Sequence, residues 1–173
     1  ENTSFVKRVL LTQFTSTGCT FCPRMTGILR DLAADSEYKD RFVLGASHAD
    51  MTGYQNGDDP AAFSGVNAFM SAFGIYGFPT LIADFGDQLN SYDLSELKTL
   101  VDGYYGDGTA LVGFAANSEV HEDAIVMRVA VKAAKAGKYR VGAWLLEDGI
   151  YGKQTSAPDD SYNVHDHCIR LVD

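Results

Sequence analysis

The sequence predicts two units of different fold class: a mixed α/β unit over residues 1–107 and a small all-β, sandwich-like unit over residues 108–173. Three observations support this division. In the first unit, apolar strand-like runs alternate with segments whose apolar residues recur every three or four positions, the spacing of one helix face. A glycine-rich break at 105–109 then interrupts this order. Beyond it, apolar and polar residues alternate with the two-residue period of half-buried strands.

The first unit should contain three strands and three helices in alternation. Strands are expected at 6–14, 42–46 and 79–84, and helices at 21–34, 60–73 and 94–104. Pro23 falls in the first turn of the first helix, where the missing N–H is tolerated. Asp58 or Asp59 is a candidate N-cap for the second helix, and Asp93 or Ser95 for the third.

The second unit should consist of about four strands. They are expected at 109–120, 124–131, 139–145 and 164–172, with a tight turn at 135–138. Four strands are few for a closed sandwich. We therefore expect this unit to continue beyond residue 173.

Charge and hydropathy argue against several function classes. The 173 residues carry 14 Lys and Arg against 23 Asp and Glu, a net charge of −9, with no basic run, so no nucleic-acid partner is expected. No stretch approaches the ~18 apolar residues of a membrane-spanning helix. The chain begins with Glu1 and lacks an initiator Met, so we expect that an N-terminal segment has been removed.

Cys19 and Cys22 are separated by two residues at the junction of the first expected strand and the first expected helix. A helix N-terminus favours a thiolate over a thiol, so Cys19 is the expected nucleophile. Cys22 lies a turn deeper and is the expected resolving thiol. The Phe78–Pro79 bond, directly before the third strand, is expected to be cis and to face the pair.

Aromatic residues near this pair suggest a binding surface for a protein substrate. Phe21, Tyr76 and Phe78 could supply an apolar platform, and the backbone beside Pro79 and Thr80 could pair with an extended substrate strand. No cofactor beyond the cysteine pair is expected. Taken alone, the Cys-x-x-Cys spacing also fits a structural disulfide, half of a zinc site or two buried thiols.

The histidines offer one competing interpretation. His165, His167 and Cys168 form an H-D-H-C cluster, which together with Cys19 and Cys22 could supply four tetrahedral metal ligands. The two halves fall in different expected units, so we expect no metal site. Cys168 is expected to be a buried, small apolar residue.

Residues 1–107 resemble the thioredoxin superfamily, on the C-T-F-C motif in its strand–helix setting and on G-F-P-T at 77–80. The resemblance implies that Cys19 is the nucleophile, Cys22 the resolving thiol and Pro79 the cis-proline. The chain departs from the family pattern at three places. Gly18 replaces the usual Trp, and Thr20-Phe21 replaces Gly-Pro. Gln13 replaces the buried carboxylate that helps to deprotonate the resolving thiol; a neutral amide cannot take that proton.

The whole chain resembles a narrower group, the thioredoxin-like outer-membrane lipoproteins of Bacteroides-type bacteria. The resemblance rests on W-L-L-E-D-G-I at 144–150 and on N-V-H-D-H-C-I-R at 163–170. It implies an exported, periplasmic or outer-membrane-associated protein with a lipid anchor. The sequence thus favours thiol–disulfide exchange on protein substrates at the cell envelope. The alternative is a non-catalytic cell-surface binding module with a structural Cys19–Cys22 disulfide.

Overall fold

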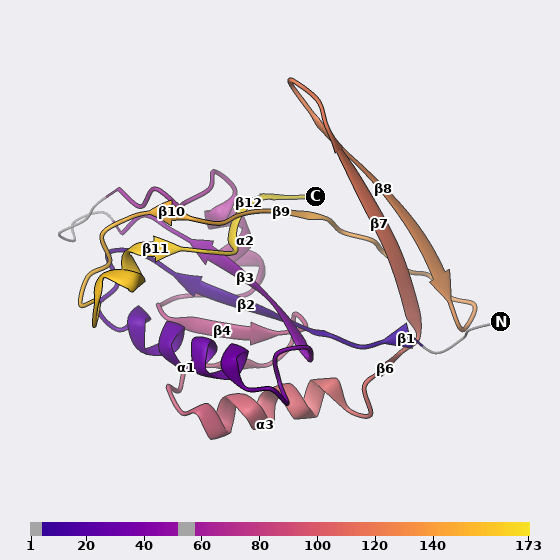
Figure 1. Cartoon of the computed structure of the whole chain (residues 1–173), viewed down its shortest axis with the longest axis horizontal. Helices are drawn as coiled ribbons and strands as arrows, with labels where there is room; N and C mark the ends of the chain where they lie inside the picture. Colours follow the sequence, from indigo (N-terminus) through magenta and orange to yellow (C-terminus); the bar gives the residue numbers. More distant parts are fainter. Residues whose placement is uncertain (1–4, 52–57) are drawn as a thin grey trace.

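A six-stranded mixed sheet forms the centre of the computed structural model, which describes residues 5–51 and 58–173 (Figure 1). Its strand order is β5-β4-β2-β3-β12-β9. The strands are β2 (Val9–Thr15), β3 (Phe42–His48), β4 (Thr80–Ala83), β5 (Gln88–Leu89), β9 (Trp144–Glu147) and β12 (Cys168–Val172). β2 pairs in parallel with β3 and antiparallel with β4, so it is buried in the middle of the sheet. The first two strands expected from sequence are therefore confirmed, and the third begins at Thr80.

Helices cover both faces of this sheet. α1 (Cys22–Ala34) and α3 (Leu94–Tyr105) lie on one face, below the sheet in Figure 1, and α2 (Val66–Ala72) lies on the other. The apolar positions at helical spacing in α1 and α3 pack against β2 and β4 in one core cluster: Val9, Leu11, Met25, Ile28, Leu29, Leu32, Tyr38, Leu81, Ala83, Leu97 and Val101. None of the helices in the described residues is long and apolar enough to span a membrane.

The helix ends agree with the sequence at α1 and α3 and differ at α2. Pro23 lies in the first turn of α1, and the Asp93 carboxylate accepts hydrogen bonds from the N–H groups of Ser95 and Glu96, as an N-cap does. The second helix, expected from residue 60, begins only at Val66 and has Gly65 as its N-cap. The expectation that Asp58 or Asp59 caps this helix was wrong, because the Asp59 carboxylate binds other groups.

The strand pairing corrects the expectation of a sandwich-like unit over residues 108–173. β7 (Val112–Val120) and β8 (Ile125–Ala133) form an antiparallel hairpin that projects from the body (Figure 1). The strands expected at 139–145 and 164–172 instead yield β9 and β12, which extend the central sheet beyond β3. β12 joins there because Cys168 and Ile169 are fully buried and because the Ala46 N–H donates to the His167 carbonyl at 2.8 Å.

Short elements complete the described chain. They are β1 (Phe5–Val6) paired with β6 (Thr109–Ala110), β10 (Ile150–Tyr151) paired with β11 (Val164–His165), and a 3₁₀ turn at Asp160–Asn163. The β10–β11 region returns to the N-terminal end of α1 before β12 enters the sheet (Figure 1). The division of the chain into two units at residue 107 stays a prediction. Two strands from beyond residue 107, β9 and β12, belong to the same six-stranded sheet as β2 and β3.

Candidate functional site

Cys19 and Cys22 form a disulfide between the end of β2 and the start of α1, with their Cα atoms 5.4 Å apart. Cys22 is the first residue of α1, and its N–H donates to the Cys19 sulfur at 3.1 Å. This N–H has no partner inside the helix, so it is available to stabilise negative charge on Cys19. Both cysteines are buried: Cys19 is 3% exposed and Cys22 is fully enclosed. Cys22 is thus the deeper of the two, as expected.

The turn that carries Cys19 is held by a hydrogen bond within the turn and by a hydrogen bond to Asp59. The Cys19 N–H donates to the Ser16 carbonyl at 3.1 Å, which closes the turn. The Thr17 N–H donates to Asp59 Oδ2 at 2.8 Å, although Asp59 lies 42 residues away in sequence. Asp59 also accepts the Ala61 N–H at 2.9 Å. The carboxylate expected as a helix cap therefore holds the cysteine turn.

A second side chain holds the same turn from the C-terminal part of the chain. Gln154 Nε2 donates to the carbonyls of Cys19 at 3.0 Å, Thr17 at 3.1 Å and Ser16 at 3.3 Å. The Thr155 N–H donates to the Thr17 carbonyl at 2.8 Å. Sequence reasoning missed Gln154, because a lone glutamine in a polar loop carries no motif.

His48 and Asp59 form a buried pair beneath this turn. His48 Nδ1 lies 2.9 Å from Asp59 Oδ2, and the two side chains are 3% and 0% exposed. Burial raises the pKa of Asp59, but the hydrogen bond and charge of His48, with the N–H groups of Thr17 and Ala61, outweigh it and lower the pKa. Asp59 is therefore ionised at neutral pH.

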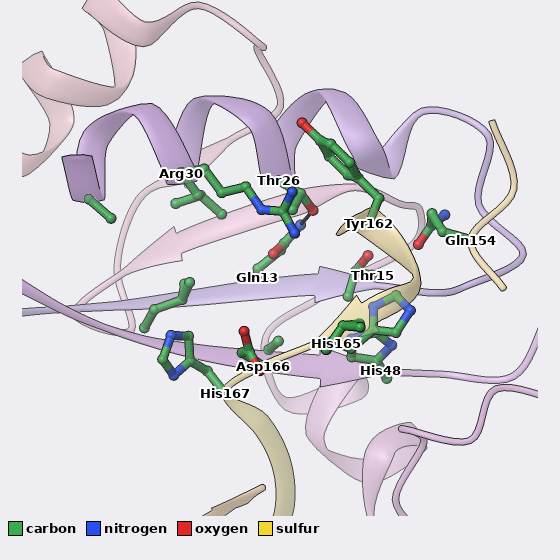
Figure 2. A pocket seen from close by; sticks show the side chains of 15 residues that line it. Gln13, Thr15, Thr26, Arg30, His48, Gln154, Tyr162, His165, Asp166 and His167 are labelled. Carbon is green, nitrogen blue, oxygen red and sulfur yellow. Dashed lines mark hydrogen bonds between the residues drawn. The ribbon is translucent and has the colours of Figure 1, made fainter. Parts of the chain in front are cut away.

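The residues of the H-D-H-C cluster point to different places. The His165 ring lies 5.0 Å from the His48 ring, and burial lowers the pKa of His165 (Figure 2). His167 is half exposed beside Asp148. Cys168 is buried, and burial raises the pKa of its thiol to about 12. The described residues contain no group of three or more His, Cys, Asp or Glu side chains arranged to hold a metal ion.

Comparison with solved structures agrees with this geometry. The chain superposes on HBP35 of Porphyromonas gingivalis with a TM-score of 0.78 at 24% identity, over 99% of this chain and 58% of that protein. The chain has a thioredoxin-like fold. It also superposes on a protein of Agrobacterium tumefaciens with a TM-score of 0.59 at 19% identity, over 98% of this chain and 72% of that protein. No family model matches the sequence, and no curated protein does.

In this thioredoxin-like fold, the Phe78–Pro79 peptide bond is cis, as the sequence predicted. Thr80, the next residue, pairs with Phe14 near the end of β2, so Pro79 lies at the edge from which the cysteine turn departs. The Thr80 hydroxyl is held by the Gly77 carbonyl at 3.0 Å. The Thr80 side chain is therefore engaged within its own segment.

The three aromatic residues of the expected platform differ in exposure. Tyr76 is 98% exposed and Phe21 is 50% exposed, whereas Phe78 packs partly into the core beside Ile75 and Phe14. Phe21 also lines a cavity of about 400 Å³ next to the cysteine pair. The other lining residues are Thr20, Pro23, Arg24, Gly27, Ser156, Pro158 and Tyr162.

Gln13 is buried on β2 and faces α1, where its Nε2 donates to Thr26 Oγ1 at 3.1 Å. This is the position that a carboxylate occupies in the thioredoxin pattern. A polar cavity of about 140 Å³ adjoins both residues and also reaches His48, His165 and Gln154 (Figure 2). Gln13 is thus a buried, neutral amide that cannot take a proton.

Proposed function

We propose that Cys19 and Cys22 exchange disulfides with protein substrates at the bacterial cell envelope. The observation that carries the proposal is the Cys22 N–H directed at the Cys19 sulfur at the N-terminus of α1, within a thioredoxin-like fold. Such a donor stabilises the thiolate that attacks a disulfide and that leaves when the reverse reaction occurs.

The exchange proceeds in two steps. In the reductive direction, the Cys19 thiolate attacks a substrate disulfide, forms a mixed disulfide and releases one substrate thiolate. Cys22 then loses its proton, and its thiolate attacks the Cys19 sulfur. This attack forms the Cys19–Cys22 bond and releases the second substrate thiolate. The protein pair loses two electrons and the substrate gains two. In the oxidative direction, the same steps run in reverse.

The proposal also states where the protein acts, at the cell envelope, and what it acts on, a protein substrate. The motifs at 144–150 and 163–170 resemble those of exported, lipid-anchored proteins, and they support the same setting for this chain. The similarity in fold to HBP35 of Porphyromonas gingivalis is consistent with that setting. The exposed Tyr76 and Phe21, with the cavity beside the pair, support an extended polypeptide as substrate. The chain spans 58% of the length of HBP35.

Single cysteine substitutions test the proposal. We expect Cys22→Ser to accumulate a stable mixed disulfide between Cys19 and glutathione, because no resolving thiol remains to break it. Mass spectrometry after acid quenching measures this adduct. Cys19→Ser is the matched control, and we expect it to form little adduct because Cys22 is enclosed. Equal labelling of the two variants would contradict the assignment of Cys19 as the nucleophile.

The alternative, a binding module with a structural disulfide, is favoured by one observation. Cys19 is 3% exposed, and Gln154 and Thr155 bind the turn that carries it. A disulfide enclosed in this way would resist reduction. The reduction potential of the pair separates the two functions.

A further inference from the structure

A cavity of about 140 Å³, lined by both polar and apolar side chains, extends from Gln13 and Thr26 to the buried pair of His48 and His165. Figure 2 shows Gln13 and Thr26 between β2 and α1, and His48 and His165 together at the edge of the same cavity. Its volume accommodates several water molecules, and its polar lining offers them partners.

One end of the cavity lies a single helical turn from Cys22. Thr26 follows Cys22 by four positions in α1, and residues at this spacing share a helix face about 5–6 Å apart. Thr26 Oγ1 and Gln13 are hydrogen-bonded to each other there. Neither an amide nor a hydroxyl accepts the proton of a thiol at neutral pH.

The other end of the cavity presents an imidazole with a defined orientation. A carboxylate only accepts hydrogen bonds, so His48 Nδ1 donates its proton to Asp59, and Nε2 of the neutral ring is left as a proton acceptor. The ionised Asp59 stabilises the imidazolium that forms when Nε2 takes a proton. This arrangement suits a group that gains and loses a proton during a reaction.

We propose that His48, oriented by Asp59, accepts the Cys22 proton through cavity water when Cys22 resolves a mixed disulfide. The inference rests on the proposed exchange function and names the group that replaces the missing carboxylate. The proton leaves Cys22 as the Cys19–Cys22 bond forms and the bond from Cys19 to the substrate breaks. The departing substrate thiolate takes a proton from solvent. In the reverse direction, the His48 imidazolium returns the proton to the leaving Cys22.

The other titratable groups around this cavity are less suited to the role. His165 Nε2 donates to the Gly152 carbonyl at 2.9 Å, and burial lowers the pKa of His165, which makes it a weaker acceptor. Among the described residues, Asp59 and His165 lie against the His48 ring. The other charged or titratable residues that line the cavity are Arg30, Tyr162, Asp166 and His167. The Asp50 carboxylate accepts the Asp59 N–H at 2.7 Å.

The test is the pH dependence of the two exchange steps with oxidised glutathione, followed by acid quenching and mass spectrometry. We expect His48→Gln to slow the resolution of the glutathione mixed disulfide by about 10–100-fold at neutral pH. We expect the formation of that adduct to be unchanged. The pH profile of the resolution rate should differ between the parent protein and the variant, because the variant lacks the proton acceptor.

Two further proteins keep the test interpretable. The double variant His48→Gln/Asp59→Asn replaces the buried His48–Asp59 pair by two amides, which can hydrogen-bond to each other. This variant should show the same slow resolution. His167→Gln, at the exposed rim of the cavity, is the matched control and should behave like the parent. Parent-like resolution with a parent-like pH profile in both His48 variants would overturn the inference while leaving the exchange function intact. A Cys22→Ser protein that forms no glutathione adduct would overturn both.

Discussion

Asp59→Ala is expected to lower the free energy of unfolding by about 3–5 kcal/mol, because it leaves several buried hydrogen-bond donors unsatisfied, each at a cost of about 1–3 kcal/mol. The Asp59 side chain is fully buried and binds His48, the Thr17 N–H and the Ala61 N–H. Its loss leaves these groups without an acceptor. Chemical denaturation of the parent and the variant measures the difference. Asp58→Ala is the control, because Asp58 is exposed and adjacent, and the same loss in both variants would contradict this account.

The lowered pKa of the Asp59 carboxyl predicts how the free energy of unfolding depends on pH in the acid range. The folded-state pKa of Asp59 lies below its ordinary value, so its contribution is complete above the unfolded-state pKa of about 3.9 and is lost as pH falls through the folded-state value. We expect the free energy of unfolding to fall less in Asp59→Asn than in the parent protein when the pH is lowered from neutral to acid. Denaturation midpoints across this range measure the effect, and parallel curves would contradict it.

Gln154→Ala is expected to make the Cys19–Cys22 disulfide about tenfold easier to reduce in glutathione buffers, a rise of about 30 mV in reduction potential. The Gln154 amide binds the carbonyls of Ser16, Thr17 and Cys19, and so holds Cys19 within bonding distance of Cys22. Without this amide the turn gains freedom, which favours the open dithiol. Thiol trapping at each buffer ratio measures the shift.

A matched glutamine controls for the general effect of this change. Gln88 Nε2 binds a single carbonyl, that of Phe73, at an exposed site on β5, so Gln88→Ala should leave the potential unchanged. An unchanged potential in Gln154→Ala as well would show that the C-terminal segment does not position Cys19.

Local patterns were sufficient to predict the part of the fold that carries the cysteine pair. The buried run of β2, the helical spacing of Met25, Ile28, Leu29 and Leu32, and Pro23 in the first turn place the pair at a strand–helix junction. The Asp93 cap and the cis bond before Pro79 are also local features, because each depends on a few adjacent residues.

Long-range pairing could not be predicted in the same way. Alternation at 164–172 indicates a strand but does not say which sheet it joins, and burial of Cys168 and Ile169 against β3 decides that β12 extends the first sheet. Asp59 has the local signature of a helix cap, yet its contacts with His48 and Thr17 depend on the tertiary fold. Gln154 reaches a turn 135 residues away, and no local pattern encodes that contact.

The reduction potential of the Cys19–Cys22 pair tests the central claim most directly. The parent protein is equilibrated in glutathione buffers and its thiols are trapped and counted by mass spectrometry, with Cys19→Ser as the control. A working exchange protein should show a reversible midpoint within roughly −120 to −270 mV, the span of known exchange proteins. A pair that stays oxidised below about −300 mV would contradict the exchange function and identify the disulfide as structural.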